Sequence, residues 1–287
     1  MADSYNEFAY VYDELMDAVP YEEWCERIVG AIDTYGITKR VREPGDPEAF
    51  EEESFDLAEP TQEELLESER NLVVDLGCGT GTVTEMLYSE GFDMIGIDNS
   101  EEMLEIAMEK KCESGSEVLY LNQDMLELEL FSTVGTVISV CDSLNYLVGE
   151  NDLETVFSLV SNYLYPGGLF IFDLNTDYKY REVIGNRTIA ESRDDCSFIW
   201  DNLYDPEKKI NEYDLTLFIE GEDGRFDRFL ETHYQKGYDP TEVKRILEEN
   251  RFKVVKMTDS ETGGDVSDTT QRIFVVAKST KEKNQNE

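Results

Sequence analysis

The chain has 287 residues, and its 65 Asp and Glu residues against 25 Lys and Arg residues give a formal net charge of -40 at pH 7. Nucleic acids and anionic lipid surfaces would repel such a chain, because proteins bind them through basic side chains that neutralise phosphates. Hydrophobic residues make up 40% of the sequence, which excludes a wholly disordered chain and is enough for one α/β core with additions.

Residues 1–42 are expected to form a helical cap. Between residues 5 and 35 the apolar side chains recur at helical spacing, and Pro20 divides this pattern into two amphipathic helices. The buried faces of the two helices would carry Phe8, Val11, Tyr12, Leu15, Trp24, Ile28 and Ile32. Because these helices precede the first strand, we expect them to cover the core.

Residues 43–70 read as an acidic, flexible insertion. The segment from 43 to 69 contains twelve acidic residues, no basic residue and three prolines. Such a composition cannot build much core, so we expect either a mobile insertion or a loosely docked lid.

Residues 71–287 are expected to form the core domain. Five short apolar runs alternate with helical periods, at 72–76, 94–98, 118–121, 136–141 and 169–174. Continuous β-rich runs separated by helices are typical of a buried parallel sheet with right-handed crossovers. The helix before the last run is predicted to end before a turn at Pro166-Gly167-Gly168.

The pattern changes after Leu174 to longer alternating segments with turn signals, which predict antiparallel strands inserted at about 187–236. A helix at 240–250 and two final strands would complete the sheet. The expected fold class is therefore α/β, with a Rossmann-like, mostly parallel sheet of seven strands, an N-terminal helical cap and an inserted antiparallel β segment after the fifth strand.

Cysteine usage and the lack of export signals favour a cytoplasmic protein. The five cysteines are scattered, without CxxC spacing, which argues for free thiols in a reducing compartment. The N-terminus lacks the basic and apolar regions of a secretory signal, and no stretch approaches the ~18 apolar residues of a membrane span. We expect no membrane or nucleic-acid partner, and either a monomer or a homodimer. The acidic surface would serve solubility or attract a cationic substrate.

The strongest motif is VVDLGCGTG at residues 73–81, where a buried strand ends at Asp75 and a glycine-rich turn leads into a helix. Glycine allows a sharp turn and a close approach of a ligand. Dinucleotide-binding enzymes use a similar turn, but their GxGxxG pattern would need glycine at Thr82. Asp75 would also repel a pyrophosphate, whereas it suits a ligand with an ammonium and a sulfonium group.

A second acidic residue, Asp98, ends the next strand, 17 residues after Gly81. This spacing is close to the ~20 residues at which an acid contacts ribose hydroxyls in this architecture. A carboxylate can accept hydrogen bonds from both hydroxyls.

Taken in order, VVDLGCGTG, MIGIDNSEEMLEIA, LYLNQDMLEL, VISVCDSLNYL and YPGGLFIFDLN resemble the motifs of the class I S-adenosylmethionine-dependent methyltransferases, over residues 72–176. The resemblance implies S-adenosyl-L-methionine as the cofactor. It implies that the glycine turn and Asp75 hold the methionine part, Asp98 the ribose, and Met103, Asp124 and Met125 the adenine. The predicted cofactor-binding residues are Asp75, Gly77, Cys78, Gly79, Gly81, Asp98, Asn99, Met103, Asp124, Met125, Cys141, Tyr12 and Trp24. The alternatives are core packing for Met103 and a strand-end acid for Asp124.

More narrowly, YNEFAYVYDELMDAVPYEEW and CDSLNYL resemble segments of small bacterial methyltransferases related to small-molecule N-methylating enzymes. That resemblance implies N-terminal helices that close over the cofactor, with Tyr5, Tyr12, Tyr21 and Trp24 as lid residues. Alternatively, these aromatic side chains pack into the core. The acidic insertion departs from the group.

The acceptor site is expected between the cap, the CDSLNYL segment and the inserted strands. His233, the only histidine, could orient the acceptor or take its proton, and Asn145, Tyr238 and Tyr5 would share the pocket. The alternative is a surface histidine. Methyl transfer is an in-line displacement that mainly requires orientation, so we expect no metal.

Two rival functions stay open. A nicotinamide-dependent oxidoreductase is disfavoured by Thr82 and Asp75, and a catalytically silent, adenosylmethionine-binding regulatory protein is compatible with the sequence. The lack of an NPPY or DPPY motif at the exit of the fourth strand argues against methylation of a nucleic-acid base or a glutamine.

Overall fold

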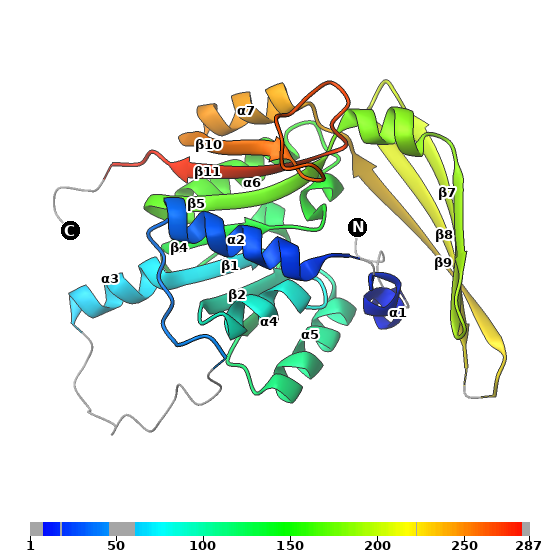
Figure 1. The fold of residues 1–287 in the computed structure, drawn as a ribbon, viewed down its shortest axis with the longest axis horizontal. Coiled ribbons are helices and arrows are strands. Elements are labelled where there is room, and N and C mark those ends of the chain that lie inside the picture. Colours follow the sequence, from blue (N-terminus) through cyan, green and yellow to red (C-terminus); the bar gives the residue numbers. More distant parts are fainter. Residues whose placement is uncertain (1–7, 18, 46–60, 222, 283–287) are drawn as a thin grey trace.

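Seven strands form one mixed sheet at the centre of the fold, in the order β10-β11-β5-β4-β1-β2-β3 (Figure 1). The computed structural model describes residues 8–17, 19–45, 61–221 and 223–282. All neighbouring strands from β3 to β5 are parallel, whereas β11 is antiparallel to both β5 and β10. The strands are β1 (Leu72–Leu76), β2 (Asp93–Asp98), β3 (Leu119–Asn122), β4 (Val134–Ser139), β5 (Leu164–Asn175), β10 (Phe252–Asp259) and β11 (Arg272–Ser279). The predicted Rossmann-like fold class is confirmed.

Helices cover both faces of this sheet. The residues of α2 (Tyr21–Tyr35) and α4 (Thr82–Ser89) pack in one apolar cluster, and those of α6 (Asp152–Tyr163) and α7 (Pro240–Glu249) in another. In the second cluster the rings of Phe157 and Phe170 meet edge to face, 5.3 Å apart. Full burial of one such side chain stabilises the fold by roughly 1.5–3 kcal/mol. Within the described ranges no helix is long and apolar enough to cross a membrane.

The N-terminal segment forms α1 (Phe8–Leu15) and α2, and the break at Pro20 agrees with the sequence pattern. Of the segment predicted as a flexible acidic insertion, residues 46–60 lie outside the described residues. Its last part forms helix α3 (Gln62–Asn71), which begins with a capping box between Thr61 and Glu64. Thr133 donates a hydrogen bond to Glu69 at 2.6 Å. This part of the segment is therefore an ordered helix joined to the core.

The inserted segment forms a second, antiparallel sheet in the order β6-β7-β8-β9. Its strands are β6 (Thr188–Ser192), β7 (Cys196–Asp205), β8 (Ile210–Glu220) and β9 (Phe226–Lys236), close to the predicted 187–236. It stands beside the core, with α1 between the two (Figure 1). The chain leaves the core after β5 and returns next to the point where it left, because Thr176 and Tyr238 form a parallel bridge.

One local prediction differs from the structure. Pro166-Gly167-Gly168 is not a turn before the fifth strand but lies inside β5, which begins at Leu164. The register with β4 shifts between Val134 and Thr136. Gly167 has a φ of 83°, a left-handed value that glycine adopts without strain, so the strand accommodates an irregularity here.

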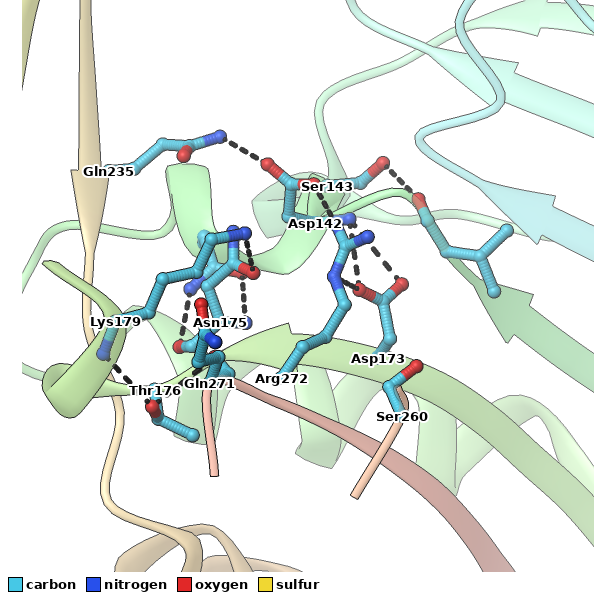
Figure 2. Close-up of polar contacts among 12 residues, drawn as sticks. Asp142, Ser143, Asp173, Asn175, Thr176, Lys179, Gln235, Ser260, Gln271 and Arg272 are labelled. Atoms are coloured by element: carbon cyan, nitrogen blue, oxygen red, sulfur yellow. Dashed lines mark hydrogen bonds and ion pairs between the residues drawn. The ribbon is translucent and has the colours of Figure 1, made fainter. Parts of the chain in front are cut away.

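A half-buried arginine joins the core to the loop that faces the inserted sheet (Figure 2). Arg272, on β11, forms an ion pair with Asp173 on β5 at 2.8 Å, and a second one with Asp142 after β4. Gln235 of β9 donates a hydrogen bond to Asp142 at 2.9 Å. Burial raises the pKa of Asp173, and the Arg272 charge opposes this shift. Removing Arg272 would leave a fully buried carboxyl without its cation.

We therefore expect Arg272→Met to lower the free energy of unfolding by about 3 kcal/mol, because an unpaired buried charge is costly. Urea unfolding followed by circular dichroism measures this change. Arg245→Met is the matched control, since Arg245 pairs with Glu249 on the exposed face of α7 and should leave the midpoint unchanged. Equal midpoints in the two variants would contradict the role of Arg272.

Candidate functional site

A pocket opens at the carboxyl ends of β1, β2 and β4, where the glycine turn, the start of α5 (Glu101–Ser114) and the N-terminal helices meet. Eleven of the predicted site residues line it: Tyr12, Asp75, Gly77, Cys78, Gly79, Asp98, Asn99, Met103, Asp124, Met125 and Cys141. Outside the lining lie Gly81, Trp24, Asn145, His233 and Tyr238. Tyr5 lies outside the described residues.

The glycines of the turn differ in which atoms surround the place where a Cβ atom would lie. A Cβ on Gly79 would meet no atom within 4 Å, so this backbone is open to the pocket. A Cβ on Gly81 would lie 2.5 Å from the Tyr120 hydroxyl. Only glycine therefore fits at this position, because the turn packs closely against β3. Both residues have left-handed φ values, 54° and 74°. Gly79 can therefore admit a ligand, whereas Gly81 serves the fold.

Asp75 ends β1 as a buried acid with one free oxygen. Its side chain is 1% exposed, and Thr84 donates a hydrogen bond to Oδ2 at 2.6 Å. Oδ1 is buried without a hydrogen-bond partner among the described residues. Burial raises the pKa of Asp75 to about 7, although the Thr84 hydrogen bond opposes the shift. A cationic group in the pocket would satisfy Oδ1 and favour the charged form.

Asp98 ends β2 and holds the glycine turn in place. Its Oδ2 accepts a hydrogen bond from the Gly79 amide at 2.8 Å, and its Oδ1 accepts one from the Ser100 amide at 2.9 Å. Burial raises the pKa of Asp98, opposed by these amide donors. Each carboxylate oxygen can accept a further bond, so this acid can bind a pair of hydroxyl groups from the pocket.

The far end of the pocket combines apolar and polar side chains. Met103 is buried on α5, and Met125 and Leu126 lie in the short helix η1 (Met125–Glu127). Asp124 caps that helix by accepting a hydrogen bond from the Leu126 amide at 2.9 Å. Its neighbour Gln123 also lines the pocket. Flexible thioethers beside a strand-end acid suit a flat ring with polar edges.

Two consecutive residues after β4 adopt a left-handed backbone that is rare outside glycine. The φ values are 59° at Cys141 and 55° at Asp142. Ser143 stabilises this turn, because its single hydroxyl proton is shared between the carbonyl oxygens of Gly77 and Val140, both 2.9 Å from Oγ. The ion pair of Asp142 with Arg272 holds it from the other side (Figure 2). Such strain persists where the surroundings impose it, commonly at functional sites.

The two cysteines of the pocket are poor nucleophiles, because burial raises the pKa of both Cys78 and Cys141 well above the usual range. They stay in the thiol form at neutral pH. A thiol is a poor nucleophile compared with a thiolate. All five cysteines of the chain are free.

The N-terminal helices close one side of the pocket. Tyr12 and Tyr21 line it, as the lid expectation requires. Asp13, which the sequence pattern did not single out, accepts a hydrogen bond from Thr80 at 2.7 Å and pairs with Lys110 of α5 at 2.5 Å. These contacts join α1 to the glycine turn. Trp24, expected in the lid, is 6% exposed, and the Arg272 guanidinium lies over its ring at 4.8 Å.

Asn145 and Tyr238, which were expected in the acceptor pocket, have internal partners instead. Asn145 donates hydrogen bonds to the carbonyl oxygens of Asn175 at 3.0 Å and Lys236 at 2.7 Å. Tyr238 donates one to the Leu147 carbonyl oxygen. Both side chains are buried. They join the turn after β4 to β5 and β9, so their polarity serves the frame of the site.

His233 lies behind the pocket rather than in it. Its side chain is 4% exposed, and Tyr146 stands between it and the pocket, which Tyr146 lines. The alternative expectation for His233 was a position on the protein surface, and the burial of its side chain does not agree with that expectation. Among the described residues no group of three or more His, Cys, Asp or Glu side chains could hold a metal ion.

Comparisons with known sequences show which family the chain resembles. The family described as "Methyltransferase domain" matches residues 73–168. The chain is 32% identical over 279 residues to "Putative methyltransferase YqeM" of Bacillus subtilis (strain 168), covering 96% of this chain and 98% of that protein. A similarly named protein of Geobacillus sp. (strain WCH70) is 32% identical over 275 residues, covering 96% and 99%.

Solved structures show the same fold. An S-adenosylmethionine-dependent methyltransferase from Clostridium acetobutylicum ATCC 824 has a TM-score of 0.77 and 26% identity, covering 96% of this chain and 99% of that one. CalS10, an amino pentose methyltransferase from Micromonospora echinaspora solved with bound cofactor, has a TM-score of 0.63 and 14% identity, covering 94% and 95%. The cofactor is S-adenosyl-L-methionine, and this chain belongs to the class I S-adenosylmethionine-dependent methyltransferases.

Proposed function

We propose that this protein transfers a methyl group from S-adenosyl-L-methionine to a small-molecule acceptor. The observation that carries the proposal is the free oxygen of buried Asp75, which lies on the pocket that the open backbone of Gly79 also lines. A buried carboxylate oxygen without a donor suits an ammonium group. The amino group of the cofactor's methionine part supplies such a donor.

The other pocket residues fit the remaining parts of the cofactor. Asp98 would accept hydrogen bonds from the two ribose hydroxyls, since its oxygens keep acceptor capacity beyond the bonds from Gly79 and Ser100. Met103 and Met125 would contact the faces of the adenine, and Asp124 its polar edge. The acidic side chains of the pocket thus offer acceptors for the amino group, the ribose hydroxyls and the adenine edge of the cofactor.

When bound, the cofactor supplies an electrophilic methyl group on a sulfonium. The chain has to orient the acceptor and keep water away from it. Three tyrosines line the pocket: Tyr12 and Tyr21 from the N-terminal helices, and Tyr146 from the turn after β4. Burial raises the pKa of Tyr12 and Tyr21, so these phenols stay neutral and can donate hydrogen bonds. They would hold a polar acceptor between apolar ring faces.

A small acceptor also follows from the surroundings of the pocket. With a net charge of -40, the protein would repel nucleic acids on approach and attract a cationic molecule. The N-terminal helices are joined to the glycine turn by Asp13, which limits access from that side. These two features favour a small acceptor over a macromolecular one.

Asp98→Ala should weaken binding of adenosylhomocysteine, the cofactor without its methyl group, at least tenfold, or about 1.4 kcal/mol. The reason is the loss of the carboxylate that binds the ribose and holds Gly79. Isothermal titration calorimetry measures the dissociation constant. Asp93→Ala, at the opposite end of the same strand, is the control and should bind within twofold of wild type. Unchanged affinity in Asp98→Ala would contradict the assignment.

The raised pKa of Asp75 predicts a pH-dependent affinity. Because only the carboxylate attracts an ammonium group, a pKa of about 7 should raise the dissociation constant of adenosylhomocysteine about tenfold between pH 8 and pH 6. Asp75→Asn should bind weakly at both pH values, with little difference between them. A wild-type affinity that is constant over this range would contradict the role of Asp75.

Asp75 has the opposite effect on the stability of the unliganded protein, which should fall, whereas ligand affinity should rise, with increasing pH. A carboxyl group whose pKa rises from 3.8 to about 7 on folding binds its proton more tightly in the folded chain. The unliganded protein should therefore lose stability as the pH rises from about 4 to about 7. Asp75→Asn should remove this contribution, which urea unfolding at several pH values measures.

A further inference from the structure

Two ionisable side chains, Glu231 and His233, are buried beside the pocket although neither lines it. Their side chains are 5% and 4% exposed, and they lie two residues apart on the same face of β9. Burying polar and charged groups costs free energy, and apolar residues of similar volume could be buried at a lower cost in free energy. Their presence next to a site therefore points to a role besides packing.

A row of contacts joins this pair to the pocket through Tyr146. Glu231 Oε2 lies 3.2 Å from His233 Nε2, and His233 Nδ1 lies 3.4 Å from the Tyr146 hydroxyl. The Tyr146 and His233 rings meet edge to face, with centroids 6.0 Å apart. Tyr146 itself lines the pocket. The row Glu231–His233–Tyr146 thus leads from the buried face of β9 to the place where an acceptor would bind.

One tautomer of His233 fits both of its neighbours in the row. With Glu231 as a carboxylate, which can only accept hydrogen bonds, Nε2 of His233 carries the proton that faces Glu231. In a neutral imidazole the other nitrogen is then an acceptor. His233 Nδ1 therefore accepts from the Tyr146 hydroxyl, which leaves the lone pairs of the phenol oxygen directed away from the histidine.

Amide side chains on both sides hold the row in place. Asn145, next to Tyr146, donates a hydrogen bond to the Lys236 carbonyl oxygen on β9. Gln235, two residues from His233, donates one to Asp142 (Figure 2). The turn that carries Tyr146 and the strand that carries His233 are therefore linked at two points. This arrangement limits how far the phenol can move from the imidazole.

We propose that Tyr146 is the catalytic residue that takes the proton of the methyl acceptor, and that His233 and Glu231 are positioning residues that act through it; this rests on the proposed function. The proton of the acceptor X–H group passes to the Tyr146 oxygen while the phenol proton passes to His233 Nδ1. The X–H electron pair stays on X and bonds the methyl carbon, and the carbon–sulfur pair stays on sulfur. Glu231 stabilises the imidazolium, and after the product leaves, His233 returns its proton to Tyr146 while Tyr146 releases one to water in the pocket that it lines.

The single histidine of the chain makes the row directly observable. Nitrogen-15 NMR of the untagged, labelled protein should show His233 with a protonated Nε2 and an unprotonated Nδ1. In Tyr146→Phe the Nδ1 resonance should shift, because its donor is gone. Adenosylhomocysteine should shift this resonance in wild type and not in Tyr146→Phe. A protonated Nδ1, or an Nδ1 resonance that is the same in wild type and Tyr146→Phe, would overturn the proposal.

Tyr234→Phe is the matched control, since Tyr234 lies next to His233 on β9 and is 44% exposed. It should leave both histidine resonances and the response to adenosylhomocysteine unchanged. Glu231→Gln should alter the Nε2 resonance and keep the Nδ1 contact with Tyr146. Tyr146→Phe removes one oxygen atom and keeps the ring, so its melting temperature shows whether the fold persists.

Turnover gives the second measurement, with an acceptor found by screening amines and phenols. Tyr146→Phe should lower kcat at least a hundredfold, and Glu231→Gln about tenfold, with adenosylhomocysteine affinity within twofold of wild type. Wild-type kcat in Tyr146→Phe would overturn the proposal. Failure of the wild-type chain to bind adenosylhomocysteine would instead defeat the proposed function, and the NMR signals of the unliganded protein would still decide whether the row exists.

Discussion

The ion pairs of Arg272 with Asp142 and Asp173 are the constraint on which the rest of the site depends. They lie where the last strand, the fifth strand and the turn after the fourth strand converge. A single guanidinium group pairs with two carboxylates and holds the left-handed backbone of Asp142. Because Asp142 also accepts a hydrogen bond from Gln235, the position of the inserted sheet depends on the same charge. The turn beside the pocket and the inserted sheet are thus linked through one cation.

The electrostatics of the pocket follow from its place at the carboxyl edge of a parallel sheet. Acidic side chains end adjacent strands there, and their burial raises the pKa of both Asp75 and Asp98. In the absence of ligand these groups are held close together at a cost in free energy. A ligand that brings positive charge and hydroxyl donors relieves that cost, so part of the binding free energy is already stored in the unliganded fold.

Much of the fold and the cofactor side could be predicted from the sequence, because both depend on local patterns. Asp75 and Asp98 each end an apolar run, and parallel pairing brings such ends to one edge. Residues that reach the site from distant parts of the chain are not marked by any such local pattern in the sequence. Asp13 and Arg272 reach the site through the docking of α1 and the antiparallel return of β11, and His233 meets Tyr146 through the approach of β9. The burial of Asn145, Tyr238 and His233 depends on the same long-range packing, which composition and spacing do not encode.

The parallel bridge between Thr176 and Tyr238 has an evolutionary consequence. The roughly sixty residues between them leave the core and return at one point, so their ends are already closed by the fold and contribute little loop-closure entropy of their own. Such a segment can be exchanged, lengthened or shortened without moving the strands that hold the cofactor. In descendants of this chain the whole sheet can therefore be replaced, while the strands that carry Asp75 and Asp98 are inherited intact.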